Sequence, residues 1–225
     1  MKSALMPALV LSCTLAACSA SSVSGVHITR ARATTLTCDQ GADNLYKPSG
    51  LLDLAGQSFA VAAATTPAYL LFLSWESTIQ PQTSTVGGQT LNDATQYTFY
   101  ASQVELKYAS ADPSIKVANA TEQISATLPP GSGPSQNAIA FDLFPPPVPT
   151  RLASLIPPGT VATGPVINVS ARIHGKIGGE ATATDWFTFP VQVVNSGVTA
   201  GSCTGTATVH PGACGYGYDT VNACR

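Results

Sequence analysis

The chain has 225 residues, with 10 lysines and arginines, 12 aspartates and glutamates, and only 10% charged residues overall. This weak and evenly scattered charge argues against a protein that binds nucleic acid. A composition poor in charge and rich in threonine, with 19 glycines and 17 prolines, is typical of an exported all-β domain, and the length suffices for one hydrophobic core.

The first 17 residues have the layout of a secretory signal peptide. Lys2 precedes an apolar run over residues 4–10, followed by small residues. The run is shorter than the roughly 20 apolar residues that span a bilayer. It ends in LAAC at residues 15–18, which resembles the lipobox of bacterial lipoproteins and implies that Cys18 is lipidated and becomes the first mature residue. Cys13 would then be discarded with the leader. The alternative is an ordinary signal peptide cleaved nearby.

A lipid on Cys18 predicts a protein anchored in the cell envelope. Two or more acyl chains hold a protein stably on a membrane, whereas one gives only marginal binding. Ser19 follows the cysteine where an aspartate would, by resemblance to the enterobacterial sorting rule, imply the inner membrane, so the sequence favours the outer membrane. The predicted divisions are a leader (1–17), a flexible tether (18–25), a β domain (26–200) and a cysteine-containing tail (201–225).

Apolar segments separated by glycine and proline predict the strands of an antiparallel fold. FAVAAA (59–64) is one strand, and AYLLFLSW (68–75) is continuously apolar, which predicts a central strand covered on both faces. In residues 96–108 the apolar parity changes after Ala101, which predicts a β-bulge at residues 102–103. EQISATL (122–128) and AIAFDLF (138–144) are expected to pair at a sheet edge, because the following PPPVP cannot occupy a central strand.

The clearest local structure is a long hairpin over residues 165–194. Alternate apolar residues from Ile167 to Ile177 share one parity, Gly178-Gly179 supplies the turn, and alternate residues from Phe187 to Val193 share one parity on the return. The pattern predicts one buried and one polar face. His174 falls on the polar face and is expected to be solvated. Together with the other strands, the hairpin predicts an antiparallel, immunoglobulin-like β-sandwich.

Four cysteines follow the leader: Cys38, Cys203, Cys214 and Cys224. An even number in an exported protein predicts two disulfides, for which three connectivities exist. We expect Cys38 to join the tail to the first strand, and the other two to close a local loop. The alternative is a zinc site of four thiolates, although close Cys-x-x-Cys pairs are absent from the sequence. Because the tail has few large aliphatic residues, we expect the disulfides to be what orders it.

Several segments together resemble a group of uncharacterised bacterial lipoproteins. They are LDLA (52–55), the apolar strand that follows, ASQVELKY (101–108), RIHGKIGGEATATDWFTFPVQVV (172–194) and CGYGYDTVNACR (214–225). The resemblance spans most of the mature chain, and its motifs are structural. In that group the hairpin runs straight into a cysteine, whereas this chain delays its first tail cysteine to Cys203.

No catalytic motif is recognisable in the sequence. His27, His174 and His210 lie outside any nucleophile elbow, zinc-binding helix or phosphate loop, so no metal or cofactor is expected. Two acids about 5 to 10 Å apart could hydrolyse a glycoside if they converged, and the candidates are Glu76, Asp93, Asp112 and Asp142.

Two classes of function follow from these observations. The favoured class is a non-enzymatic binding or structural module of the envelope, which presents loops or an edge strand to an envelope protein or a glycan. Tyr216 and Tyr218 are candidate aromatic residues for such a surface, although packing within the tail is the simpler interpretation. The alternative class is a small hydrolase that acts on polysaccharide.

Overall fold

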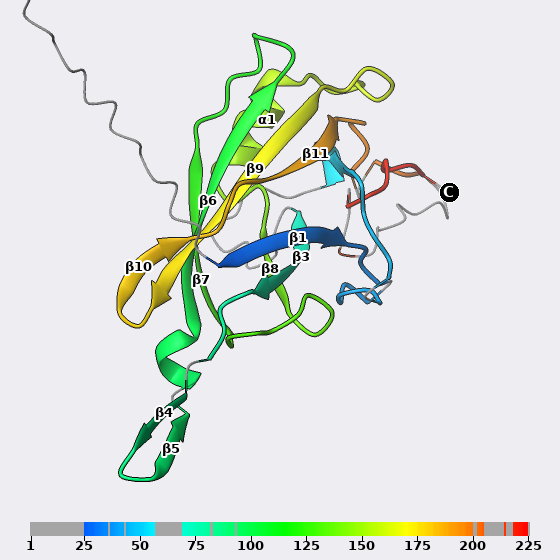
Figure 1. Cartoon of the computed structure of the whole chain (residues 1–225). Helices are drawn as coiled ribbons and strands as arrows, with labels where there is room; N and C mark the ends of the chain where they lie inside the picture. Colours follow the sequence, from blue (N-terminus) through cyan, green and yellow to red (C-terminus); the bar gives the residue numbers. More distant parts are fainter. Residues whose placement is uncertain are drawn as a thin grey trace, which may run out of the picture.

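The computed structural model describes residues 25–35, 37–42, 44–56, 69–81, 83–92, 94–199, 202–204, 214 and 218–224. The predicted leader with Cys18, the predicted strand at 59–64, Asp93, His210 and Tyr216 lie outside the described residues. Within them, two β-sheets pack face to face, which confirms the predicted all-β sandwich (Figure 1).

The smaller sheet has three antiparallel strands in the order β1-β3-β8, namely β1 (Val26–Arg32), β3 (Leu70–Ser77) and β8 (Ala138–Asp142). The larger sheet has the order β2-β11-β9-β6-β7, with β10 also paired to β9. Its strands are β2 (Gly50–Asp53), β6 (Phe99–Ser110), β7 (Ala120–Leu128), β9 (Val166–Ile177), β10 (Glu180–Ala183) and β11 (Phe187–Val194). A separate hairpin of β4 (Thr83–Val86) and β5 (Gln89–Asn92) projects away from the sandwich (Figure 1).

The central strand β3 supplies the largest buried side chain of the core, Trp75. Leu71, Leu73 and Trp75 are almost fully buried, and β3 lies between β1 and β8 as predicted. Leu70 and Phe72 on its other face are only partly buried, so the prediction that both faces are covered is wrong for that face. Two short 3-10 helices, η1 (Leu54–Gly56) and η2 (Ala94–Tyr97), complete the connections around this core.

The bulge and the hairpin predicted from residue parity are confirmed. The pairing of β6 with both neighbours shifts between Ala101 and Gln103, while Phe99 and Val104 on either side of the shift stay buried. Opposite the bulge, a Cβ atom on Gly175 would lie 2.3 Å from the Tyr100 carbonyl oxygen, so no larger residue fits there. The hairpin turns at residues 178–179, and both β10 and β11 pair with β9.

One sequence expectation about the middle of the chain is wrong. Strand β7 is the edge of the larger sheet and β8 the edge of the smaller one, so the two do not pair with each other. The proline run lies outside the strands, as predicted, and leads into a short helix, α1 (Val148–Leu155), which the sequence did not predict. Val148, Leu152 and Ile156 are buried at a spacing of four residues, which places one apolar stripe of the helix against the core.

The four cysteines form two disulfides, Cys38–Cys214 and Cys203–Cys224. The zinc alternative is therefore wrong, and Cys38 joins the tail to the loop after β1, as expected. The tail also forms contacts that the sequence did not predict. Tyr218 is 1% exposed, forms an isolated bridge with Leu52 of β2, and stacks on Tyr69 at 4.6 Å between ring centroids.

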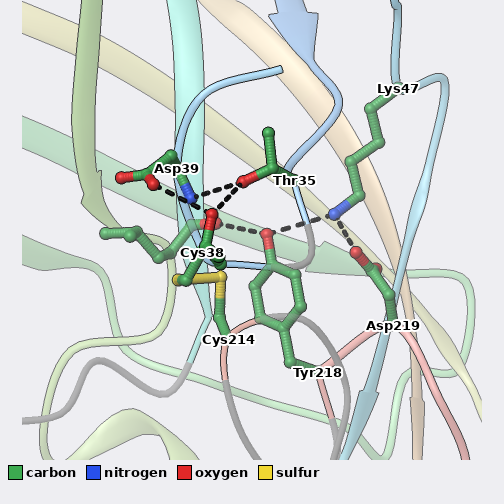
Figure 2. The surroundings of a disulfide bond; sticks show 9 residues. Thr35, Cys38, Asp39, Lys47, Cys214, Tyr218 and Asp219 are labelled. Atoms are coloured by element: carbon green, nitrogen blue, oxygen red, sulfur yellow. Dashed lines mark hydrogen bonds and ion pairs between the residues drawn. A yellow bond between two sulfur atoms is a disulfide. The ribbon is translucent and has the colours of Figure 1, made fainter.

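A partly buried cation, Lys47, and two acids, the exposed Asp219 and the buried Asp53, form contacts with the described tail residues. The Lys47 ammonium lies 4.5 Å from the centre of the Tyr218 ring and pairs with Asp219 (Figure 2). Burial lowers the pKa of Lys47, and the charge of Asp219 opposes that shift. Asp53, which is fully buried, accepts N–H groups from Ala55 and Ser196 at 3.0 Å and from Asn222 at 2.9 Å. Among the described tail residues, Tyr218 is therefore part of the core, and contacts other than the disulfides hold this segment.

Candidate functional site

A groove of about 790 Å³ opens between the start of β7 and helix α1. One wall is a continuous run, residues 116–121, and the other is built from residues 146–148, Thr150, Arg151 and Ser154. Six of the twelve lining residues are apolar: Val117, Ala118, Ala120, Pro146, Pro147 and Val148. The volume falls within the range of roughly 300 to 1,000 Å³ that is usual for sites of small ligands.

Local sequence explains how each wall is placed. After β6, the Asp112 carboxylate accepts the Ser114 backbone N–H at 2.9 Å and the Ser114 hydroxyl at 2.7 Å, which fixes a turn before the first wall. The same bonds lower the pKa of Asp112, which is an exposed turn residue. The second wall is held because Val148 and Leu152 insert into the core, which turns Thr150, Arg151 and Ser154 outward.

The charge of the groove is entirely positive. Lys116 and Arg151 line it, and none of the twelve lining residues is an acid, a histidine or a cysteine. Neither cation forms an ion pair with another described residue. The Arg151 guanidinium donates to the Ser154 hydroxyl at 3.5 Å. The groove therefore offers apolar surface, polar donors and positive charge, but no general base beside a nucleophile.

The three proposed acids that lie within the described residues, Glu76, Asp112 and Asp142, do not converge. Glu76 lies on β3 opposite His27 of β1, and Asp112 lies in the exposed turn. Asp142 is buried, and its carboxylate accepts the backbone N–H groups of Tyr69 at 2.9 Å and Phe144 at 3.0 Å. These acids are spread over the sandwich, and none of them lines the groove.

Asp142 instead meets Glu122, an acid that sequence reasoning missed. The Asp142 backbone N–H donates to the Glu122 carboxylate at 2.8 Å. Desolvation, with the nearby charge of Asp142 as a second cause, raises the pKa of Glu122 to about 7. Residue parity could have identified Glu122 from the sequence. It is the one charged residue of β7, and it shares the inward-facing parity of Ile124. The pair lies between the sheets and outside the groove.

Replacement of Glu122 by glutamine should change how stability depends on pH. The raised pKa means that Glu122 stabilises the fold below its usual value of 4.5, and that this contribution is lost as pH rises through 7. The stability of the wild-type protein should therefore fall as the pH is raised from 5 to 8, and the stability of the variant should fall by a smaller amount. Urea midpoints at three pH values would test this, with exposed Glu180→Gln as control. Parallel profiles for wild type and E122Q would contradict it.

The outer face of the larger sheet carries a second polar cluster. His174 has the predicted polar orientation, but it is not simply solvated: its Nε2 lies 3.0 Å from Oε2 of Glu105, and this contact lowers the pKa of Glu105. The Lys107 ammonium lies 4.0 Å from the centre of the partly exposed Trp186 ring. Within the described residues, no group of three histidines, cysteines or acids could hold a metal ion. Tyr218 is buried, so it cannot serve as a surface aromatic residue.

The described segments include no helix long and apolar enough to cross a membrane. The two disulfides fit a domain that folds in an oxidising compartment outside the cytoplasm. Comparison of the chain with protein-family models, curated proteins and solved structures found no match.

Proposed function

We propose that this protein is a non-enzymatic binding module of the bacterial cell envelope, and that the groove between β7 and α1 is its binding site. The observation that carries the proposal is the composition of the groove: apolar walls, two cations, and no acid, histidine or cysteine among its lining residues. Such a site can retain a ligand that is largely apolar and negatively charged. It lacks the side chains that hydrolysis of a polysaccharide requires.

The envelope location rests on the first 18 residues and on the disulfides. A short apolar leader that ends in LAAC predicts lipid attachment at Cys18, and two disulfides agree with export. The lipid would hold the module on a membrane, most simply the outer membrane, without a spanning segment. This assignment agrees with the resemblance to uncharacterised bacterial lipoproteins.

Replacement of Cys18 by alanine is expected to abolish incorporation of labelled fatty acid and to leave an unprocessed or soluble protein. The reason is that the thioether to the diacylglycerol forms only on the cysteine sulfur. Cys13→Ala is the control, because residue 13 is discarded before the mature protein is complete. Unchanged labelling and membrane retention in C18A would contradict the lipoprotein assignment.

Blocking the groove should abolish ligand binding. The probe is 8-anilinonaphthalene-1-sulfonate, an apolar anion whose fluorescence rises when it leaves water. Ala118→Trp places a large side chain in the groove, and Ala111→Trp makes the same change on the exposed turn before it. We expect A111W to bind the dye like the wild type and A118W to bind it at least about tenfold more weakly, the loss that follows from about 1.4 kcal/mol. Equal binding by both variants, or no binding by the wild type, would contradict the proposed site.

A further inference from the structure

We infer that the ligand of the groove is an extended, acidic peptide segment of a partner protein, which runs along residues 116–121 and continues onto the open β7 edge of the larger sheet. This inference rests on the proposed function and specifies the ligand of the same site. It follows from three independent features of the described residues: an unpaired strand edge, a backbone wall and the sign of the charge.

The two edges of the larger sheet differ in whether another segment of the chain pairs with them. At the β2 edge, the tail pairs through Leu52 and Tyr218, and the Asp219 backbone N–H donates to the Leu51 carbonyl at 2.8 Å. At the other edge, β7 is nine residues long and pairs with β6 alone among the described strands. An uncovered edge presents unpaired N–H and C=O groups to any strand that approaches it.

Side chains on β7 do not obstruct such pairing. Sheets usually protect an edge with lysine, proline or a short strand. The outward side chains of β7 are small or neutral and exposed: Thr121, Gln123, Ser125 and Thr127. The single charge, Glu122, points inward and accepts the Asp142 N–H. This inward acid limits free association of the edge, but it leaves the outer backbone groups accessible.

The groove continues this edge. Its first wall consists of six consecutive residues, 116–121, and the last two of them are the first residues of β7. Within the described part of the chain, no hydrogen bond involves the backbone of residues 116–119. An extended peptide laid here would find backbone partners on one side and the apolar surface of Pro146, Pro147 and Val148 on the other. Strand addition beside a groove is an established mode of peptide recognition.

The charge of the site selects among peptides. Lys116 and Arg151 lie on opposite walls, and the lining contains no acid. A peptide with aspartate or glutamate would meet complementary charge, whereas a basic peptide would be repelled.

Synthetic octapeptides with blocked ends would test the inference. The parent alternates valine and aspartate, and a second peptide has lysine in place of aspartate. Two further versions carry N-methyl groups on all valines or on all aspartates, which removes the N–H groups from one edge of the strand or from the other. Affinities would be measured by titration of the folded protein, and amide hydrogen exchange of residues 116–121 would be compared with and without the parent.

We expect the acidic parent to bind at least about tenfold more tightly than the basic peptide and to slow amide exchange at 116–121. One N-methylated version should retain the parent's affinity, and the other should lose about tenfold or more. Lys116→Glu should weaken binding of the parent more than Lys176→Glu, which makes the same charge change on the exposed outer face. The inference is overturned if both N-methylated versions bind like the parent, or if the dye occupies the groove while no peptide binds. In the latter case the proposed binding module stands, whereas failure of dye and peptides together would overturn both.

Discussion

Replacement of Cys38 and Cys214 together by serine is expected to lower the free energy of unfolding by about 5 kcal/mol, estimated from chain entropy. The bond joins residues 176 positions apart, so its loss releases nearly the whole chain in the unfolded state. The same estimate gives only about 3 kcal/mol for Cys203 and Cys224, which are 21 positions apart. Urea unfolding of the two double variants and the wild type would measure both changes.

The informative result is which of the two double variants loses more stability. C203S/C224S opens only a local loop, and Tyr218 should stay docked because its ring stacks on Tyr69 and its hydroxyl donates to the Leu70 carbonyl at 2.6 Å. Amide exchange at Asp219, whose N–H binds the Leu51 carbonyl, should therefore remain slow in that variant. A larger loss of stability from C203S/C224S than from C38S/C214S would contradict this account, as would free thiols in the native protein.

Replacement of Asp53 by alanine is expected to cost about 4 kcal/mol of stability. Three buried or half-buried backbone N–H groups, from Ala55, Ser196 and Asn222, would lose their acceptor at once. Each unsatisfied buried donor costs about 1 to 3 kcal/mol. The three donors come from η1, the segment after β11 and the tail, so the variant loosens the junction of all three. Denaturant unfolding gives the size of the change.

Two further variants make this prediction specific. Asp53→Asn keeps one acceptor oxygen and should fall between the wild type and D53A. Asp185→Ala removes a carboxylate whose side chain is 80% exposed and pairs with His27 at the surface, so it should change stability by less than about 0.5 kcal/mol. Equal effects of D53A and D185A would show that Asp53 does not hold the tail.

The parts of the fold that sequence predicts well are those set by local alternation. Strand β6 and its bulge follow from the parity change after Ala101, and the hairpin follows from alternation around a Gly-Gly turn. Pairing between distant segments has no local signal in the sequence. The sequence therefore predicts that β7 and β8 pair at one sheet edge, whereas they belong to different sheets. Helix α1 was missed because eight residues with a proline in the first turn carry too short a pattern.

Most of the candidate site could not be predicted from the sequence. Composition and an even cysteine count correctly predicted the disulfides. The docking of the tail depends on contacts between distant residues: Tyr218 binds the Leu70 carbonyl, and Asp53 binds the backbone N–H groups of Ser196 and Asn222. The groove arises where residues 116–121 and 146–154 come together, and neither segment contains a motif. The inward parity of Glu122 was a readable signal, whereas its partner Asp142 was identifiable only from the packed sheets.

Mapping the bound dye on the isotope-labelled protein by NMR would test the central claim most directly. Titration with 8-anilinonaphthalene-1-sulfonate should shift the amide signals of residues 116–121 on one wall of the groove, and those of Val148, Thr150, Arg151 and Ser154 on the other. Signals from the outer face around His174 and Trp186 should stay in place. Saturable shifts confined to the two walls are the predicted result, and shifts centred on the outer face, or none at any dye concentration, would contradict the claim that the groove is the binding site.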